Sequence, residues 1–478
     1  MVFSSTIFLF LFLPIVLAVY YLLDKHYKNT WLLMVSLFFF FWGEKKNIVI
    51  ILVSIIINYS FGLFIHAYRN RQSFVRYGGG RIIISLGIII NLALLFFYKY
   101  LDFSINTFNN LFRMSLPLKN IALPIGISFF TFQGMTYIID LYWGNTEVQK
   151  NPLKVALYIS LFPQLIAGPI VRYKDVASQL SCRISSCDKF YSGIKRFVAG
   201  LAKKVIIANT VASVVDNIFA NPYSENTFVT AWLGIICYTI QIYFDFSGYS
   251  DMAIGLGRMF GFEFLENFNY PYISKSITEF WRRWHISLSS FFKDYLYIPL
   301  GGNRKGNVYI NLIIVFFATG LWHGASMNFV IWGLWHGLFI IIERQFRNRG
   351  IVLFGKIPNL FKNVYTLLVV IIGWVLFRSD NLKYAAGYLR IIFGLQKPDM
   401  VGFTTAYYID AFLILVLVFG CILSCPVINI IKKYLETLEG KTLIIAKTIE
   451  GIFVLFLFIM SSILVITSNY NPFIYFRF

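Results

Sequence analysis

Apolar runs of about twenty residues recur along the whole chain and constrain its fold more than any other feature. A helix of about 20 apolar residues crosses the hydrocarbon core of a bilayer, where backbone polar groups must be satisfied inside the protein. Several of the runs are short or interrupted by Gly, Pro or charge, which is typical of re-entrant helices. They lie at residues 5–23, 31–42, 47–68, 82–100, 121–143, 153–171, 190–219, 228–248, 308–322, 326–342, 363–377, 407–431 and 446–468. The sequence therefore predicts an all-α, polytopic membrane protein with about 11–13 membrane segments, re-entrant helices included.

Composition supports a membrane environment and excludes other classes. The chain is 58% hydrophobic and 13% charged, with a mean hydropathy of +0.69, whereas a soluble domain is roughly 45–50% apolar and about 25% charged. A transmembrane β-barrel would show alternating segments of about ten residues, and the sequence contains none. Because no linker or repeat separates one part of the sequence from another, residues 1–478 are predicted to form a single membrane domain.

The net charge of +20 indicates contact with membrane lipid rather than with nucleic acid. Basic residues collect in cytoplasmic loops and near anionic headgroups, and the sequence lacks RNA-binding and zinc-finger motifs. Residues 172–204 carry eight basic and two acidic side chains, and residues 344–362 carry five basic and no acidic ones. Both segments are therefore predicted to face the cytoplasm.

The five cysteines are predicted to be free thiols. None has a second Cys or a His at the spacing of a metal site, so no metal site is expected. Cys182 and Cys187 share the basic segment 172–204, and disulfides are rare in the cytoplasm.

Ionisable residues gather between Trp-rich apolar segments at residues 278–337. This stretch begins TEFWRRWHISLSSFFKDYLYIPLGG, ends ATGLWHGASMNFVIWGLWHG, and contains three of the five histidines: His285, His323 and His336. An ionisable group at membrane depth costs a few kcal/mol or more, so it is a functional-site hypothesis by default. We interpret residues 278–337 as a buried active site.

An ordered set of sequence motifs runs from about residue 90 to the end of the chain. The motifs begin at Leu123 (LPIGISFFTFQGMTYIIDLYWG), Leu161 (LFPQLIAGPIVRY), Gly200 (GLAKKVIIAN), Tyr243 (YFDFSGYSDMAIGLGRMFGF), Phe280 (FWRRWHISLS), Leu321 (LWHGAS), Gly373 (GWVLFRSDNLKYA) and Asn471 (NPFIYFRF). Each motif is weakly specific alone, whereas the ordered set is specific. The set resembles the membrane-bound O-acyltransferase (MBOAT) family, and the likeness is greatest to its bacterial branch of alginate-acetylation proteins.

The resemblance implies a ring of helices around a central funnel and an acyl transfer from a thioester to a hydroxyl group. It implies acetyl-CoA as the cytoplasmic acyl donor, with no bound cofactor. The acceptor would be an extracytoplasmic polysaccharide, and an SGNH-type acetyltransferase would be the partner outside a bacterial cytoplasmic membrane.

His323 is the predicted general base. It matches the Trp-His-Gly motif of the family, and an imidazole can take a hydroxyl proton near neutral pH; the alternative is a core histidine with a structural partner. His285 matches a second polar residue that the family carries upstream of the catalytic histidine. On a continuous helix, Trp281, Trp284, His285 and Leu288 would share one face, which would aim His285 into a cavity, although a structural hydrogen bond is also possible.

The remaining candidates are substrate-binding residues. Trp322 and Trp284 are expected to contact the substrate. Arg282 and Arg283 would either form local ion pairs, as the i, i+4 spacing of Glu279 and Arg283 allows, or guide a phosphate-bearing donor. On one continuous helix His336 would lie about 220° around from His323, so the two would not share a face. His336 could then either support the residues that contact the substrate or pack in the protein interior.

Three further interpretations complete the set. The polar island of Tyr243, Asp245, Ser247, Tyr249, Ser250 and Asp251 is assigned a structural role. D-alanyl transfer to teichoic acid is the alternative reaction within the family, and it would require a carrier-protein thioester as the donor. A transporter without covalent chemistry also accommodates polar residues at membrane depth, but the sequence shows no inverted repeat.

The predicted orientation can be tested with the two cysteines of the basic segment. If residues 172–204 face the cytoplasm, an impermeant thiol reagent should label Cys182 and Cys187 only after the cells have been permeabilised. Strong labelling of these cysteines in intact cells would show that the orientation is inverted.

Overall fold

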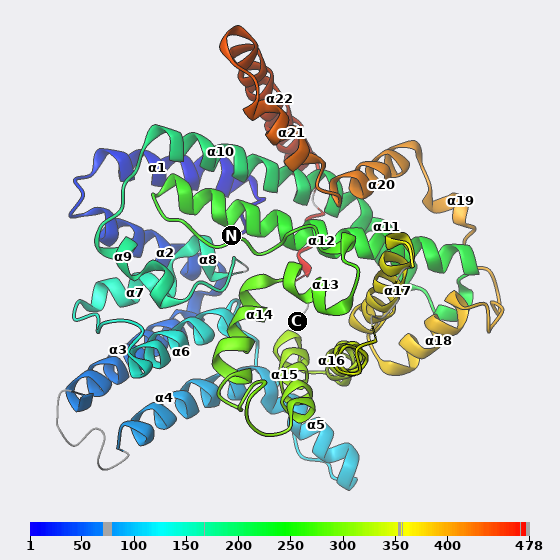
Figure 1. Ribbon diagram of the computed structural model, residues 1–478, viewed down its shortest axis with the longest axis horizontal. Coiled ribbons are helices and arrows are strands. Elements are labelled where there is room, and N and C mark those ends of the chain that lie inside the picture. Colours follow the sequence, from blue (N-terminus) through cyan, green and yellow to red (C-terminus); the bar gives the residue numbers. More distant parts are fainter. Residues whose placement is uncertain (70–78, 167, 352–354, 356, 469, 475–478) are drawn as a thin grey trace. The chain divides into compact units, whose positions relative to one another are not determined.

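A computed structural model describes residues 1–69, 79–166, 168–351, 355, 357–468 and 470–474. Regular secondary structure within these ranges is helical throughout, without any strand (Figure 1). The all-α prediction is therefore confirmed. The closing motif is described as far as Ile474, and its last four residues, 475–478, lie outside the described residues.

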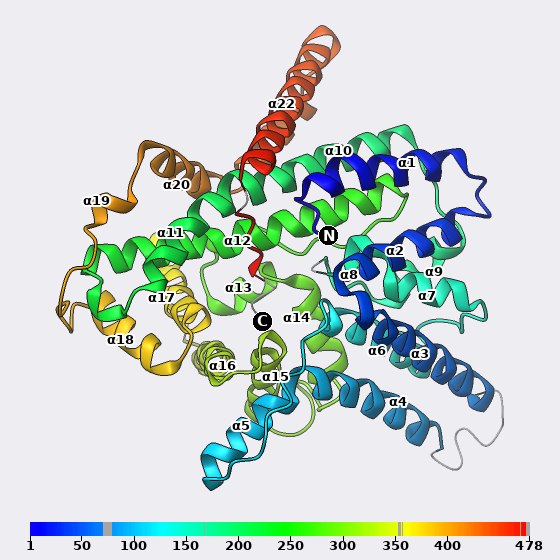
Figure 2. The same cartoon turned by 180° about the vertical axis from the view of Figure 1, so that it is seen from behind.

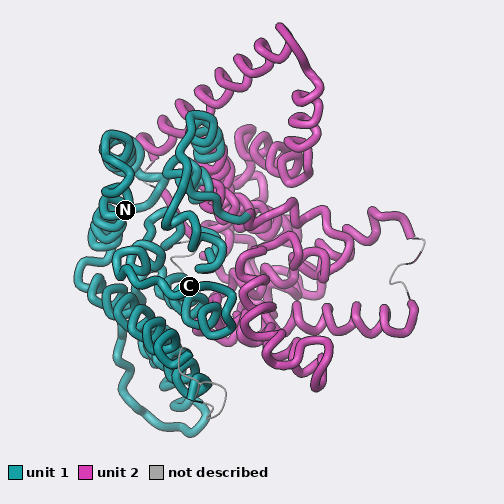
Figure 3. Tube along the Cα trace, turned by 60° about the vertical axis from the view of Figure 1, so that its left-hand side comes forward, with its two compact units in different colours: residues 1–197, 252–265 teal, residues 198–251, 266–478 magenta. Residues whose placement is uncertain are grey.

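The chain divides into two compact units, which Figure 3 distinguishes by colour. The first unit comprises Met1–Phe197 and Met252–Leu265, and the second comprises Val198–Asp251 and Glu266–Phe478. Each unit thus draws on two separate stretches of sequence. That residues 1–478 form one membrane domain, with a ring of helices around a funnel, stays a prediction.

The first unit is built around α6 (Ile127–Trp143), which is buried at almost every position. It packs against α3 (Ile48–Arg69) and α4 (Gly79–Leu95). The side-chain amides of Asn58 and Asn91 exchange two hydrogen bonds of 3.0 and 3.1 Å between α3 and α4, as polar side chains do between membrane helices. The other helices of this unit are Phe8–Phe12, α1 Leu13–Leu22, α2 Lys28–Glu44, Lys45–Asn47, Phe96–Tyr100, α5 Leu101–Phe112, α7 Pro152–Ser160, α8 Phe162–Leu165, α9 Tyr173–Ser181 and most of α10 Cys187–Ala202.

The second unit contains all the candidate site residues. Its central pair is α15 (Val308–His323) and α16 (Met327–Asn348), which pack closely because Gly320 and Gly333 leave no side chain between them. Small residues at such a crossing let two helix backbones approach. The other helices are Lys203–Ala208, α11 Asn209–Ala220, Tyr223–Glu225, α12 Phe228–Met259 (shared with the first unit), Pro271–Ile273, α13 Ile277–Arg283, α14 Ile286–Phe292, Lys293–Tyr297, α17 Asn359–Arg378, α18 Leu382–Ile392, α19 Thr405–Tyr408, α20 Ala411–Leu423, α21 Val427–Glu436 and α22 Gly440–Thr467.

Six helical stretches of the described chain are long and apolar enough to cross a membrane, or seven if the bent pair α20 and α21 forms one span. One of them, α22, extends together with α21 away from the remaining helices of its unit in both views (Figures 1 and 2), and it buries only Ser461 and Ser462. A largely apolar helix with so little protein contact is suited to a lipid environment. The chain is thus a multi-pass membrane protein.

The higher count of about 11–13 membrane segments came from apolar runs, many of which form helices shorter than 18 residues. The run at 153–171, for example, is divided into α7 and α8, with Pro163 in the first turn of α8, where proline is tolerated. The run at 308–322 forms α15, with 16 residues. The number of membrane segments therefore stays a prediction.

The five cysteines are free thiols, as predicted, and Cys182 and Cys187 are exposed, so the labelling experiment is feasible.

The polar island of α12 supplies two ion pairs within the second unit. Asp245 lies 2.8 Å from the Lys204 ammonium, and these side chains are 1% and 2% exposed. Asp251 lies 2.7 Å from Lys203, which is more exposed. These contacts support the structural role that was assigned to the island, because buried charges require a partner.

The buried ion pair also holds the closing segment of the chain. The Lys204 ammonium donates to the Pro472 carbonyl and, at 2.8 Å, to Asn209 Oδ1. The Ile474 backbone N–H donates to Asp245 Oδ2 at 2.9 Å. One lysine and one aspartate thus fix residues 472–474 against α12, although these residues are more than two hundred positions away in the sequence.

Removing one charge of the buried pair should destabilise the second unit. Asp245→Asn leaves the Lys204 ammonium without its counter-charge, which typically costs about 3–5 kcal/mol. The melting temperature in detergent should therefore fall. Asp251→Asn is the matched control, and it should lower the melting temperature less because Lys203 can reach solvent. A smaller effect of Asp245→Asn than of Asp251→Asn would contradict this account.

Candidate active site

His323 is the last residue of α15, where the chain reverses into α16. The reversal is tight because Gly324 has no side chain: a Cβ there would overlap the Phe329 ring. His323 is 5% exposed. Its ring meets those of Trp322, Trp332 and Phe377 edge to face, with centroids at 4.9, 4.9 and 5.2 Å. Aromatic groups from α15, α16 and α17 therefore fix the orientation of the imidazole.

A small cavity with a mainly apolar lining lies beside His323 within the second unit. His323 is the ionisable residue of this lining, which otherwise consists of aromatic and aliphatic side chains. Trp284 lies on the cavity wall, whereas Trp322 packs on the imidazoles of His323 and His285, at 4.9 and 5.6 Å. The lining residues are Ile242, Phe246, Trp284, His323, Trp332, Trp374, Phe377 and Ile474.

His285 lies close to His323, although the prediction of one continuous helix around it was wrong. α13 ends at Arg283, Trp284 is extended, and His285 has left-handed backbone angles, with φ +44°. Histidine adopts this region more readily than most residues. The ring centroids of His285 and His323 are 6.3 Å apart. The structure therefore brings the two predicted catalytic residues together by a helix break rather than by helical periodicity.

The break is stabilised by the segment before α13, which sequence analysis did not identify. The Ile286 N–H donates to the Asn267 carbonyl, and the Asn269 N–H donates to the Arg283 carbonyl, each at 2.9 Å. These bonds occupy backbone groups that a continuous helix would have paired internally. Since they join residues far apart in the sequence, no local pattern indicates them.

His336 lies deeper in the unit, among aromatic rings of α13, α16 and α17. It is fully buried, stacks on Phe280 at 6.1 Å, and meets Trp281 and Trp332 edge to face at 5.4 and 5.2 Å. Trp332 also contacts His323, so its indole lies between the two imidazoles. This position supports the packing role for His336, and substrate binding by it stays a prediction.

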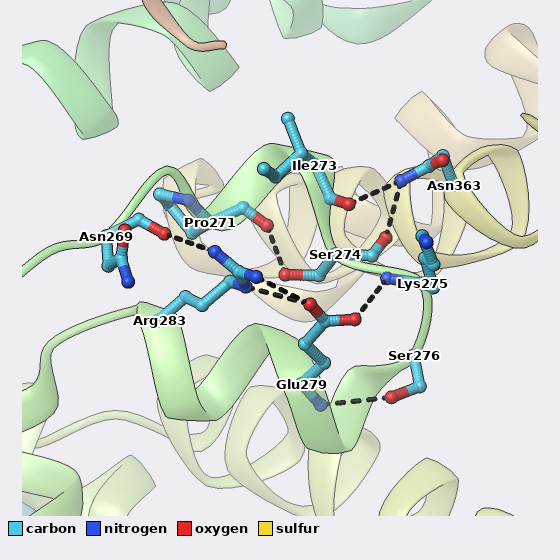
Figure 4. A network of polar contacts seen from close by, with 9 residues as sticks. All are labelled: Asn269, Pro271, Ile273, Ser274, Lys275, Ser276, Glu279, Arg283 and Asn363. Carbon is cyan, nitrogen blue, oxygen red and sulfur yellow. Dashed lines mark hydrogen bonds and ion pairs between the residues drawn. The ribbon is translucent and has the colours of Figure 1, made fainter. Parts of the chain in front are cut away.

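Arg283 joins α13 to the preceding loop (Figure 4). It forms an ion pair with Glu279 at 2.9 Å, as the i, i+4 spacing predicted, and also donates to the Asn269 carbonyl at 3.1 Å. Glu279 in turn accepts the Lys275 N–H. These contacts support the ion-pair interpretation for Arg283. Arg282 is exposed, and its role in guiding a phosphate-bearing donor stays a prediction.

Glu343 of α16 is a second residue that sequence analysis missed. Its carboxylate accepts the Ile277 N–H at 2.6 Å and both the N–H and the hydroxyl of Thr278, at 2.9 and 2.6 Å. A carboxylate at a helix N-terminus satisfies donors that have no partner within the helix. Glu343 thereby fixes the start of α13, the helix that leads to Trp284 and His285.

The arrangement provides an imidazole at the wall of an apolar cavity, with a second imidazole nearby. Such a site can take a proton from a hydroxyl group while excluding bulk water. Within the described ranges, no cluster of three or more His, Cys, Asp or Glu side chains is arranged to hold a metal ion.

Neutralising Glu343 should loosen α13. Glu343→Gln keeps the size of the side chain but replaces one acceptor oxygen by an amide nitrogen, so one of the buried N–H groups of α13 loses its partner. The expected loss of stability is about 2 kcal/mol, as for hydrogen bonds to charged groups. It can be measured as a decrease in melting temperature in detergent.

Thr278→Val is the control, because it removes only the hydroxyl donor and leaves both backbone bonds. It should lower the melting temperature less than Glu343→Gln. If Glu343→Gln is as stable as the unmodified protein, the carboxylate does not fix α13.

Known proteins resemble this chain over most of its length. The model of the membrane-bound O-acyltransferase family matches residues 95–378, which include both His285 and His323. The probable alginate O-acetylase AlgI of Pseudomonas aeruginosa is 44% identical over 87% of this chain and 81% of that protein. The peptidoglycan O-acetyltransferase of Helicobacter pylori is 36% identical over 84% of this chain and 81% of that protein.

A more distant relative has a different reaction in its name. The teichoic acid D-alanyltransferase of Bacillus subtilis is 30% identical over 45% of this chain and 58% of that protein. The family model covers more than half of the chain, and the relatives that align with most of it are named as O-acetylating enzymes. The chain therefore belongs to the membrane-bound O-acyltransferase family and is a multi-pass O-acyltransferase.

Proposed function

We propose that this enzyme transfers an acetyl group from a cytoplasmic thioester, acetyl-CoA, for the O-acetylation of an extracytoplasmic polysaccharide. The observation that carries the proposal is the cavity itself, where His323 stands in a wall of aromatic and aliphatic side chains. The wall suits a small apolar acyl group, and the imidazole suits a hydroxyl that must lose its proton.

In the proposed reaction, a hydroxyl oxygen attacks the thioester carbonyl carbon, so that a C–O bond forms and the C–S bond breaks. His323 takes the hydroxyl proton as the C–O bond forms, and the proton then passes to the departing thiolate. Aromatic contacts fix the ring of His323, which holds the base in place before the substrate arrives. Such pre-organisation is worth more in a dry site than in water.

The cavity supports acetyl transfer over D-alanyl transfer. A D-alanyl group carries an ammonium, and burying a charge without a partner is costly. The described residues that line the cavity include no carboxylate to pair with it. The two relatives that align over most of the chain and are described above are named for O-acetylation, which also favours acetyl transfer. Membership of an enzyme family argues against the transporter alternative.

The donor and the partner are those that the family resemblance implies, and the predicted orientation agrees with them. If the basic segment 172–204 faces the cytoplasm, its basic residues other than Lys203 and Lys204, which pair with Asp251 and Asp245, would attract the phosphates of a CoA thioester, as basic groups attract phosphate in general. The acceptor polysaccharide would then lie outside a bacterial cytoplasmic membrane, together with an SGNH-type acetyltransferase as the partner.

Removing the proposed base should abolish acetylation. General-base catalysis typically contributes about 10²–10⁴ in rate, so His323→Ala should leave no measurable acetyl on the secreted glycan of a complemented deletion strain. His285→Ala should also lower the acetyl content of the glycan, but by less than His323→Ala. His336→Ala should lower the stability of the protein more than the rate of acetyl transfer. The acetyl content is measured against the amount of each variant in the membrane.

The control for His323→Ala is its own level in the membrane, which should match that of the unmodified protein. Normal acetylation by a well-expressed His323→Ala protein would remove His323 from the mechanism.

A further inference from the structure

The side chain of Asn267 is buried beside His285 and accepts hydrogen bonds from two residues of α14 and its N-terminus. Asn267 is 1% exposed. Its Oδ1 lies 3.1 Å from the Ser287 backbone nitrogen, 2.9 Å from the Ser287 hydroxyl, and 3.2 Å from His285 Nδ1. Three groups thus converge on one amide oxygen.

The chemistry of these groups determines where the proton of His285 lies. A backbone N–H can only donate, so the Asn267 atom that faces Ser287 must be the carbonyl oxygen of the amide. A carbonyl oxygen can only accept, so His285 Nδ1 must carry a hydrogen. A neutral imidazole has one N–H group, and Nε2 therefore keeps its lone pair.

The side chains that pack around His285 are aromatic. The imidazole is fully buried and lies edge to face with Phe246 at 4.6 Å and with Trp322 at 5.6 Å. Within the described part of the chain, Nε2 has no hydrogen-bond partner. Phe246 also lines the cavity beside His323. A buried acceptor without a partner is costly, and a substrate hydroxyl would satisfy it.

We propose that Asn267 is a positioning residue for acyl transfer, because it holds His285 in the Nδ1–H form. His285 Nε2 then accepts a hydrogen bond from an O–H group of the acyl acceptor, such as a sugar hydroxyl adjacent to the one that reacts. Neutral His285 cannot donate through Nε2 to the oxygen that becomes negative in the transition state. In this form His285 orients the acceptor and does not stabilise the developing charge. The identification of the ligand as an acyl acceptor rests on the proposed function, whereas the position of the proton on His285 does not.

The position of the proton can be measured without any activity. The full-length protein is labelled with ¹³C and ¹⁵N at histidine and placed in lipid nanodiscs, and the His285 signal is identified by its loss in His285→Gln. Chemical shifts separate the two neutral forms of an imidazole. The unmodified protein should show the Nδ1–H form, although the Nε2–H form predominates for histidine in water.

Substitutions at Asn267 connect this signal to the reaction. Asn267→Leu removes the acceptor, so the Nε2–H form should appear and the acyl-transfer rate should fall about 10²-fold, as for a misplaced substrate. Asn267→Asp keeps an acceptor oxygen and should retain the Nδ1–H form and most of the rate. Asn269→Leu is the matched control: its side chain is exposed, and both measurements should stay unchanged.

Three results would overturn the proposal: an Nε2–H form in the unmodified protein, an unchanged tautomer in Asn267→Leu, or a changed tautomer with an unchanged rate. If Asn267→Leu does not fold, Asn267→Asp and the unmodified protein decide the question, because loss of the Nδ1–H form or of the rate in Asn267→Asp contradicts it. Failure of the proposed function would look different, since the unmodified protein would then transfer no acetyl group while the tautomer remained Nδ1–H.

Discussion

The site depends on how two short buried helices satisfy their backbone N–H groups. α13 and α14 have seven residues each, so most of the N–H groups at their first turns have no partner within the helix. Leaving such groups unpaired in an apolar interior costs about 1–3 kcal/mol each. Side chains and carbonyls from other parts of the second unit accept them instead. The Glu343 carboxylate accepts N–H groups of α13, and the backbone and side-chain oxygens of Asn267 accept N–H groups of α14.

Breaking the helix between α13 and α14 is what creates the site. In a single continuous helix His285 would have helical backbone angles, whereas it adopts left-handed ones. With the break, Trp284 lies on the cavity wall and His285 lies near His323. Aromatic rings of α15, α16 and α17 then surround His323, and the rings of Phe246, Phe268 and Trp322 pack against His285. The same constraint extends to the closing segment, where the pair of Lys204 and Asp245 holds Ile474 on the cavity wall.

Sequence patterns could predict those features that arise from local chemistry or from family motifs. The apolar runs predicted the helices, and the Trp-His-Gly motif identified the histidine that the structure places on the cavity wall. The pattern WRRWHISL suggested a continuous helix, because its apolar residues recur at helical spacing. The break is stabilised by backbone bonds of Asn267 and Asn269, whereas Glu343 fixes the start of α13. None of these contacts joins neighbours in the sequence, so no local pattern indicates them. For the same reason the packing of His336 against Phe280 and Trp281 could not be derived from its spacing to His323.

The most direct test of this account is to determine where the acyl group binds. A cryo-electron microscopy structure of the full chain in a nanodisc, with a non-cleavable thioether analogue of acetyl-CoA, would locate it. The account predicts that the acyl group lies in the cavity lined by Trp284 and Trp374, with its carbonyl carbon beside His323. An acyl group bound elsewhere, with that cavity empty, would contradict the account.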